Sequence, residues 1–288
     1  MASPQAWKSR LLPIYNASVH GSRRAARILE ALLRGQIAHC HVCGRLGPHV
    51  LRRGVLAPEL VRRWELPPRL VCAFTRKESL DCAWCGASLR VRRLASVILE
   101  RFPAGPSKSI AQWVKQREIQ DLRIAEINGI AGLTKWLQAL PNHRYSEYQP
   151  APSKRIPHED LTKLTYGDQS FDLVLTSETL EHVPDLPKAL GEIHRVLIPG
   201  GRHLFTIPWR PDVPRTYARA TLNDGQFTPN STVIHHPGGD YGYPVFTEMG
   251  LDFPDQLHDA GFDVEVRFGP VCMDDVAQVC VTTRHVGA

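Results

Sequence analysis

The sequence predicts an α/β fold, in which a mainly parallel sheet with an antiparallel carboxy-terminal edge follows a small helical, cysteine-containing module. Three observations support this prediction. From about residue 121, apolar strand-like runs alternate with helical patterns, as in parallel sheets covered on both faces. Two strand-like runs, "FDVEVRFG" and "AQVCVTTR", follow each other near the end and predict a closing hairpin. Two C-x-x-C pairs stand in the first third of the chain.

The second part of the chain supplies the elements of this sheet in order. The other expected strands are "LRIAEIN", "RYSEY", "FDLVLTS" and "GRHLFTIPW". The expected helices are "LTKWLQAL", "LPKALGEIHRVL" and "FPDQLHDAGF". Within the second helix, Leu186, Leu190 and Ile193 recur at helical spacing, which predicts one apolar face against the sheet.

Composition and charge predict an ordinary globular protein built from two different parts. The chain has 288 residues, of which 43% are hydrophobic and 22% charged. It has no apolar run of the length of a membrane span and no evident secretory signal, so we expect a cytoplasmic protein. Residues 1–117 contain 21 Lys and Arg against 6 Asp and Glu, whereas the rest of the chain is acidic. The segment "FPAGPSKS" marks an expected boundary between a module at 1–108 and a domain at 109–288.

The two C-x-x-C pairs predict a structural zinc site. Each pair is followed by a glycine, Gly44 or Gly86, at which a tight turn with positive φ is expected. Four thiolates suit the tetrahedral geometry that zinc prefers. The alternatives are a redox C-x-x-C and unrelated buried thiols. The sequence also leaves Cys72 without a spaced partner, so we expect it in the core. The predicted zinc ligands are Cys40, Cys43, Cys82 and Cys85.

The basic first part leaves two interpretations open. In "GASLRVRRLASVILERF" the residues Val91, Leu94 and Ile98 form one helical face, and arginines occupy the others. An exposed arginine surface could bind nucleic acid. The interpretation that we favour is a closed structural zinc site with a solvated arginine face. Pairing of some arginines with the acidic second part is a separate way to account for the charge asymmetry.

Polar and acidic residues follow successive strands of the predicted sheet. In such sheets, ligands bind beyond the carboxyl ends of the strands. Ser177 and Asp185 are also candidate helix N-caps, which is the structural alternative for this pattern. The residues in question lie at 126–132, 147–148, 159–161 and 177–182.

The ordered set "AEINGIAGL", "YSEY", "HEDLTKL", "FDLVLTSETLEHV" and "HRVLIPGGRHLFTIP" resembles class I S-adenosylmethionine-dependent methyltransferases, most closely the type 11 group, over roughly residues 118–285. The resemblance implies a Rossmann-like fold and S-adenosylmethionine as cofactor. One departure concerns the first loop, which in the family usually reads acid-x-Gly-x-Gly. Here Asn128 and Ile130 replace the two glycines. Asn is the residue other than Gly that best tolerates left-handed backbone angles, so the turn can survive.

The resemblance also implies roles for individual residues. Glu126 and the loop that contains Asn128, Gly129 and Gly132 would cradle the amino-acid end of the cofactor. Glu147 would bind the ribose hydroxyls, because a carboxylate can accept two hydrogen bonds from a diol. The adenine would meet Asp160 and Leu161, and the methionine side would meet Ser177 and Glu178, with His182 close by.

The segment at about 210–252 contains many Pro, Gly, His and Tyr residues and little helical pattern. Long segments of this kind inside a domain are usually functional, and the family often covers its substrate there, so we expect a lid. Tyr243 is a further candidate for substrate contact. A hydroxyl acceptor would need a base with a pKa near neutrality, which favours histidine. The candidates for substrate contact or catalysis are His182, His235, His236 and Tyr241.

The sequence thus predicts a zinc-containing methyltransferase that acts on a small-molecule metabolite. One alternative is a zinc-dependent nucleic-acid-binding protein with a degenerate cofactor domain. The other is a cyclase or lyase that uses S-adenosylmethionine without transferring a methyl group. Nucleic acid as main substrate and a membrane association are not expected, and a homodimer is left open.

Overall fold

The computed structural model describes residues 25–34, 36–52, 54–151, 155–237, 242–268 and 277–285. Its centre is a six-stranded sheet with the order β14-β15-β7-β6-β4-β5. Four strands, β5, β4, β6 and β7, run parallel to one another, whereas β15 pairs antiparallel with both β7 and β14. The predicted mainly parallel Rossmann-like sheet and its antiparallel carboxy-terminal edge are therefore confirmed. The strands are β4 (Ile124–Ile127), β5 (His143–Ser146), β6 (Phe171–Ser177), β7 (Leu197–Thr206), β14 (Phe262–Arg267) and β15 (Val279–Arg284).

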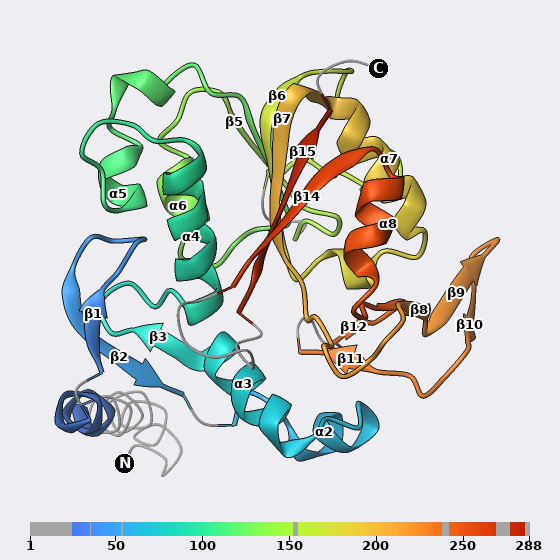
Figure 1. Cartoon of the computed structure of the whole chain (residues 1–288), viewed down its shortest axis with the longest axis horizontal. Helices are drawn as coiled ribbons and strands as arrows, with labels where there is room; N and C mark the ends of the chain where they lie inside the picture. The colour runs from blue at the N-terminus through green and yellow to red at the C-terminus, as the bar shows by residue number, and fades with distance from the viewer. Residues whose placement is uncertain are drawn as a thin grey trace, which may run out of the picture.

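Alternate residues of the central strands belong to two separate cores, one on each face of the sheet. On β6, Leu173 and Leu175 belong to one core and Val174 to the other. Helices α4, α5 and α6 cover the first face, and α7 and α8 cover the second (Figure 1). Such two-sided burial explains why these strands read as continuous apolar runs. The helices are α4 (Leu89–Arg101), α5 (Ile110–Trp113), α6 (Thr134–Leu137), α7 (Leu186–Val196) and α8 (Phe253–Asp259), with the 3-10 turns η1 (Arg117–Ile119) and η2 (Leu180–His182).

Capping residues fix where the two longest covering helices begin. Ser88 accepts a hydrogen bond from the backbone N–H of Val91 at 3.5 Å, and Asp185 accepts one from Lys188 at 3.1 Å. The N-cap predicted at Asp185 is therefore confirmed. The one considered at Ser177 is wrong, because Ser177 is the last residue of β6 and its hydroxyl faces Thr206.

The first part of the chain forms a three-stranded antiparallel sheet and two further helices. Residues 25–33 are helical. The segment between the C-x-x-C pairs contains α2 and α3 and is largely helical. Cys72 lies exposed on α3, and the prediction that it belongs to the core is wrong. The elements are β1 (Ile37–His39), β2 (Leu46–Leu51), α2 (Pro58–Arg63), α3 (Pro68–Ser79) and β3 (Leu80–Cys82).

The segment at 210–252 forms short strand pairs without a helix in its described residues. A third hydrophobic core joins it to the first part of the chain, because Ile234 and Val245 pack with Leu70 and Phe74 of α3. The β9–β10 hairpin projects away from the sheet (Figure 1). The strands are β8 (Tyr217–Ala218), β9 (Ala220–Asn223), β10 (Gln226–Pro229), β11 (His235–His236), β12 (Tyr243–Pro244) and β13 (Thr247–Glu248).

One core crosses the expected boundary at residue 108. It contains Cys40 and Cys82 from the first part together with Leu173 and Leu204 from the sheet. Helix α4 contributes Leu94 and Ile98, which are fully buried. The division into 1–108 and 109–288 stays a prediction. In the described residues, no helix has both the length and the apolar character that a membrane span requires.

Candidate functional site

The loop after β4 is held by hydrogen bonds to the buried side chain of Glu126. This side chain has no exposed surface (0%) and accepts a hydrogen bond from the backbone N–H of Ile130 at 2.9 Å. Its carboxylate also meets the hydroxyl of Thr134 at 2.5 Å and Nε2 of His143 at 2.9 Å. Glu126 therefore holds the loop in place from inside the protein.

The two unusual residues of this loop have clear structural roles. Asn128 adopts φ of 62°, the left-handed conformation expected of it in place of glycine. Its side-chain oxygen accepts from the backbone N–H of Tyr148 at 3.0 Å, which ties the loop after β4 to the loop after β5. Ile130 is 1% exposed and packs in the core below the loop.

Both glycines of this loop lie against other chain segments. A Cβ on Gly129 would come within 2.7 Å of the hydroxyl of Tyr145, and Gly129 is exposed. Gly132 has φ of +86°, and a Cβ there would lie 3.4 Å from the backbone of Ala87. The loop after β4 is therefore packed against the end of the second C-x-x-C loop.

The residues expected near the ribose and adenine follow β5. Glu147 is partly exposed, and its carboxylate accepts a hydrogen bond from the hydroxyl of Tyr145. Burial, together with this carboxylate, raises the pKa of Tyr145 above its ordinary value, so the phenol stays a donor. Asp160 accepts from both the backbone N–H and the hydroxyl of Thr162 at 2.8 Å, which leaves its second oxygen free of these bonds. Leu161 is buried, at 3% exposure.

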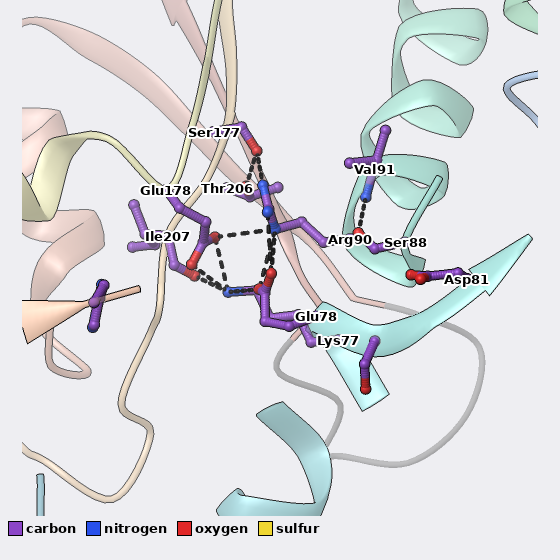
Figure 2. Close-up of polar contacts among 12 residues, drawn as sticks. Lys77, Glu78, Asp81, Ser88, Arg90, Val91, Ser177, Glu178, Thr206 and Ile207 are labelled. Carbon is purple, nitrogen blue, oxygen red and sulfur yellow. Dashed lines mark hydrogen bonds and ion pairs between the residues drawn. The ribbon is translucent and has the colours of Figure 1, made fainter. Parts of the chain in front are cut away.

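The end of β6 meets two cations from the first part of the chain, as Figure 2 shows. Nζ of Lys77, on α3, lies 2.9 Å from the carboxylate of Glu178 and has no exposed surface (0%). The guanidinium of Arg90, on α4, donates to the hydroxyl of Ser177. Glu178 itself adopts φ of 52°, a strained angle for this residue type. Ser177 and Glu178 thus lie at the expected edge, with their side chains engaged by α3 and α4.

Arg90 links these groups into one network. It pairs with Glu78 at 3.0 Å and lies 3.9 Å from Glu178. Burial lowers the pKa of Arg90, but the carboxylates of Glu78 and Glu178 more than compensate and raise it above its ordinary value. Sequence reasoning missed Lys77 and Arg90 as parts of this site, because no spacing pattern connects them to β6.

Two of the candidate histidines, His182 and His236, lie together with Tyr243, whereas His235 lies apart from them. The rings of His182 and His236 lie 5.1 Å apart, and the Tyr243 ring lies 5.8 Å from that of His182. Burial lowers the pKa of His182, which favours a neutral imidazole. His235 is exposed, because adjacent strand residues point to opposite sides. Tyr241 lies outside the described residues.

The four cysteines of the C-x-x-C pairs come together. Sγ of Cys40 lies 3.7 Å from that of Cys85, and Sγ of Cys43 lies 3.9 Å from that of Cys82. Four sulfurs around one zinc ion at 2.3 Å would lie about 3.8 Å apart. Gly44 and Gly86 have φ of 78° and 75°, as expected for the turns that close each pair. The geometry therefore fits a tetrahedral zinc ion.

The arginines of α4 face the protein more than the solvent. The guanidinium of Arg92 donates to the carbonyls of Leu80 and Ala87 at 2.7 and 2.8 Å. Arg101 pairs with Glu265 of β14. The prediction of a solvated arginine face is therefore wrong at Arg92, which is 4% exposed because its guanidinium is used by these carbonyls. Arg101 shows the other interpretation, in which an arginine pairs with the acidic second part.

Comparison with known proteins gives a family match in the middle of the sheet. Residues 130–205 match the family model described as "Methyltransferase domain". The match runs from the loop after β4 to β7 and thus includes most loops at the carboxyl edge. This part of the chain is therefore similar to the methyltransferase-domain family.

Curated relatives and solved structures are similar over parts of the chain. A demethylmenaquinone methyltransferase of Staphylococcus epidermidis is 40% identical over 60 residues, 21% of this chain and 25% of that protein. The ubiquinone/menaquinone biosynthesis C-methyltransferase UbiE of Dinoroseobacter shibae is 33% identical over 113 residues, 36% of this chain and 44% of that protein. This chain thus spans less than half of either relative. A solved S-adenosylmethionine-dependent methyltransferase of Mesorhizobium loti covers 57% of this chain and 91% of its own, at 21% identity and a TM-score of 0.39.

Proposed function

We propose that this chain is an S-adenosylmethionine-dependent methyltransferase that acts on a small-molecule metabolite. The observation that carries the proposal is the methyltransferase-domain match at 130–205, because it coincides with the loops at the carboxyl edge of the sheet. Ligands of open parallel sheets bind at that edge. The relatives that act on quinones support a small-molecule acceptor.

The residues at this edge fit the cofactor. The backbone at Asn128 and Gly129 would receive the amino-acid end, supported by the exposed glycine and by the turn that Asn128 makes. Glu147 would bind the ribose hydroxyls, and Asp160 and Leu161 the adenine. S-adenosylmethionine supplies an activated methyl group when bound. The chain's own contribution would be alignment of the acceptor and exclusion of water, with His182, His236 and Tyr243 on the acceptor side.

We also propose a structural zinc ion on Cys40, Cys43, Cys82 and Cys85. The support is the agreement between the observed sulfur separations and those of a tetrahedral site. These sulfurs are part of the core that reaches the sheet, and the second C-x-x-C loop abuts Gly132. The ion would thus stabilise the second C-x-x-C loop, which packs against the loop after β4, and would have no role in the reaction.

The nucleic-acid alternative has less support. Its arginine surface requires exposed guanidinium groups, whereas Arg92 is 4% exposed and Arg90 is engaged with Glu78 and Ser177. To bind phosphate groups, these arginines would have to give up their present hydrogen bonds and ion pairs. A cyclase or lyase that uses the same cofactor differs from a methyltransferase in its product, and product analysis alone distinguishes the two.

The test is to incubate the full chain with S-adenosylmethionine and a metabolite panel that includes hydroxylated quinones, and to analyse the products by mass spectrometry. We expect an acceptor heavier by one methylene unit, together with S-adenosylhomocysteine. Calorimetry should independently show binding of the cofactor. Absence of binding of either the cofactor or its demethylated product would defeat the proposal. Cofactor consumption with an unmethylated product would favour the cyclase or lyase.

A further inference from the structure

A buried carboxylate and two imidazoles converge beside the candidate active site, apart from the four cysteines. Glu181 and His182 lie in η2, and His236 comes from β11. One ligand atom from each of the three residues can be chosen so that all lie within 4.8 Å of one another. Oε1 of Glu181 lies 3.5 Å from Nε2 of His182 and 3.5 Å from Nδ1 of His236.

Glu181 lacks the partners that a buried carboxylate needs. Its side chain is 0% exposed, and neither of its oxygens has a hydrogen-bond partner within the described residues. Its separations of 3.5 Å from the imidazoles are longer than ordinary hydrogen bonds. A buried charge without close partners costs several kcal/mol. The same separations suit three ligands of one cation, since ligand atoms about 2.1 Å from a tetrahedral zinc ion lie about 3.4 Å apart.

His182 is held in the tautomer that a metal ligand requires. Its Nδ1 lies 2.8 Å from the carbonyl oxygen of Pro244, which can only accept a hydrogen bond. Nδ1 therefore carries the proton, and Nε2 is left with a free lone pair facing Glu181. An imidazole that donates its other N–H to a backbone carbonyl is the usual arrangement at protein metal sites.

The surroundings keep these groups in place. The backbone N–H of Phe246 donates to the carbonyl of Glu181 at 2.8 Å and anchors η2 to the 210–252 segment. The His236 ring packs on Trp64, with 5.0 Å between ring centroids. The three groups come from two chain segments that are joined by these bonds, so the arrangement is built into the fold.

We propose that Glu181, His182 and His236 bind a divalent transition-metal ion, with zinc as the representative ion. Two imidazoles and one carboxylate are donors that suit zinc and its neighbours more than magnesium or calcium. Three protein ligands leave a coordination position open, as in catalytic metal sites. A hydroxyl oxygen of the acceptor bound at this position would have a lowered pKa. The two imidazoles would then act as metal ligands, and neither would need to serve as the base that removes the acceptor's proton. The metal site itself does not depend on the proposed methyl transfer.

Metal counting on the full chain tests this proposal. The protein is saturated with zinc, passed over a desalting column and analysed for metal per chain. We expect two ions in the wild type and one in each of the variants Glu181→Gln and His236→Ala. The matched control is His235→Ala, the exposed neighbour, which should keep both ions. Cobalt substitution separates the sites by spectroscopy, because only the cysteine site gives thiolate charge-transfer bands.

Each outcome decides between a metal ion bound by Glu181, His182 and His236 and a metal-free network of the same residues. A wild type with a single ion, bound through thiolates alone, overturns the proposal and leaves a metal-free buried network of Glu181 with the two histidines. Two ions that persist in both Glu181→Gln and His236→Ala overturn it as well. Because the wild-type count needs no variant, a folding defect in a variant does not weaken the test. Cofactor calorimetry on the same samples separates failure of the metal site from failure of the proposed methyltransferase.

Discussion

The ammonium group of Lys77 lies 2.9 Å from the carboxylate of Glu178, although 101 residues separate them in the sequence. Nζ of Lys77 also donates to the carbonyl of Ile207 at 2.7 Å. The pair joins α3 to the carboxyl end of β6, where the methionine side of the cofactor is expected (Figure 2). The first part of the chain is thus attached to the candidate site by an ion pair in which Lys77 is fully buried and Glu178 is partly buried.

Replacing Lys77 should destabilise the protein strongly. In Lys77→Met, Arg90, at 3.9 Å, is the one nearby cation that Glu178 keeps among the residues that the structure describes. Loss of one partner of a buried pair costs roughly 3 kcal/mol or more, and urea unfolding measures it. The exposed control Lys188→Met should stay within about 0.5 kcal/mol of wild type. In the double variant with Glu178→Gln, the loss should be smaller than the sum of the single losses. Wild-type stability of Lys77→Met would show that the pair contributes nothing.

Removal of the proposed structural zinc should destabilise the whole domain. Cys40 and Cys82 share a core with Leu173 and Leu204 of the central sheet, and structural zinc contributes directly to folding free energy. We expect Cys82→Ser to lower the melting temperature of a single transition that includes the sheet. Calorimetry with and without a chelator makes the measurement. The control is Cys72→Ser, since Cys72 is exposed. A separate early transition, with the sheet melting unchanged, would contradict the shared core.

Much of this architecture was predictable from the sequence because the signals are local. Strand–helix alternation predicts the sheet, and the repeated C-x-x-C-G predicts the clustered thiols. The contacts of Lys77 and Arg90 were not predictable, since they depend on how α3 and α4 pack onto the sheet. Glu181 stands in a prominent polar stretch, but its relation to His236 arises only when η2 and β11 meet.

Glu147→Ala should weaken cofactor binding without unfolding the protein. The carboxylate is partly exposed and oriented by Tyr145, so its loss would remove the proposed charged hydrogen bonds to the ribose, worth roughly 1–3 kcal/mol. Calorimetric titration with S-adenosylhomocysteine makes the measurement. Tyr145→Phe should give a smaller loss in the same direction, because it releases the carboxylate but leaves it in place. Exposed Glu118 offers the control Glu118→Ala. Unchanged affinity in Glu147→Ala would assign the ribose to another residue.

Acid should destabilise the protein partly through His203 on β7. Its side chain is buried next to Phe205, and burial lowers its pKa from 6.5 to about 3. Below pH 6.5 the unfolded chain binds a proton that the folded chain excludes, so stability falls as the pH decreases toward 3. The loss should approach ~1.4 kcal/mol per pH unit. Urea unfolding between pH 7 and 4.5 should show a shallower slope for His203→Gln than for wild type. The exposed His258→Gln should keep the wild-type slope, and equal slopes in all three would exclude this role.

The two adjacent histidines of β11 should differ sharply in function. His236 faces Glu181 and His182, whereas His235 is exposed on the other side of the strand. Once an acceptor is identified, we expect His236→Ala to lower kcat by about 100-fold or more, in the range of a lost catalytic or metal-holding group. Cofactor affinity should change little, because the cofactor contacts come from the strand ends. His235→Ala should stay close to wild type in kcat, and Tyr243→Phe should change mainly KM. Steady-state kinetics beside cofactor titrations distinguish these effects. Equal losses of kcat in His235→Ala and His236→Ala would mean that both residues of β11 help to cover the acceptor. They would also mean that His236, despite its place beside His182, has no specific role in turnover.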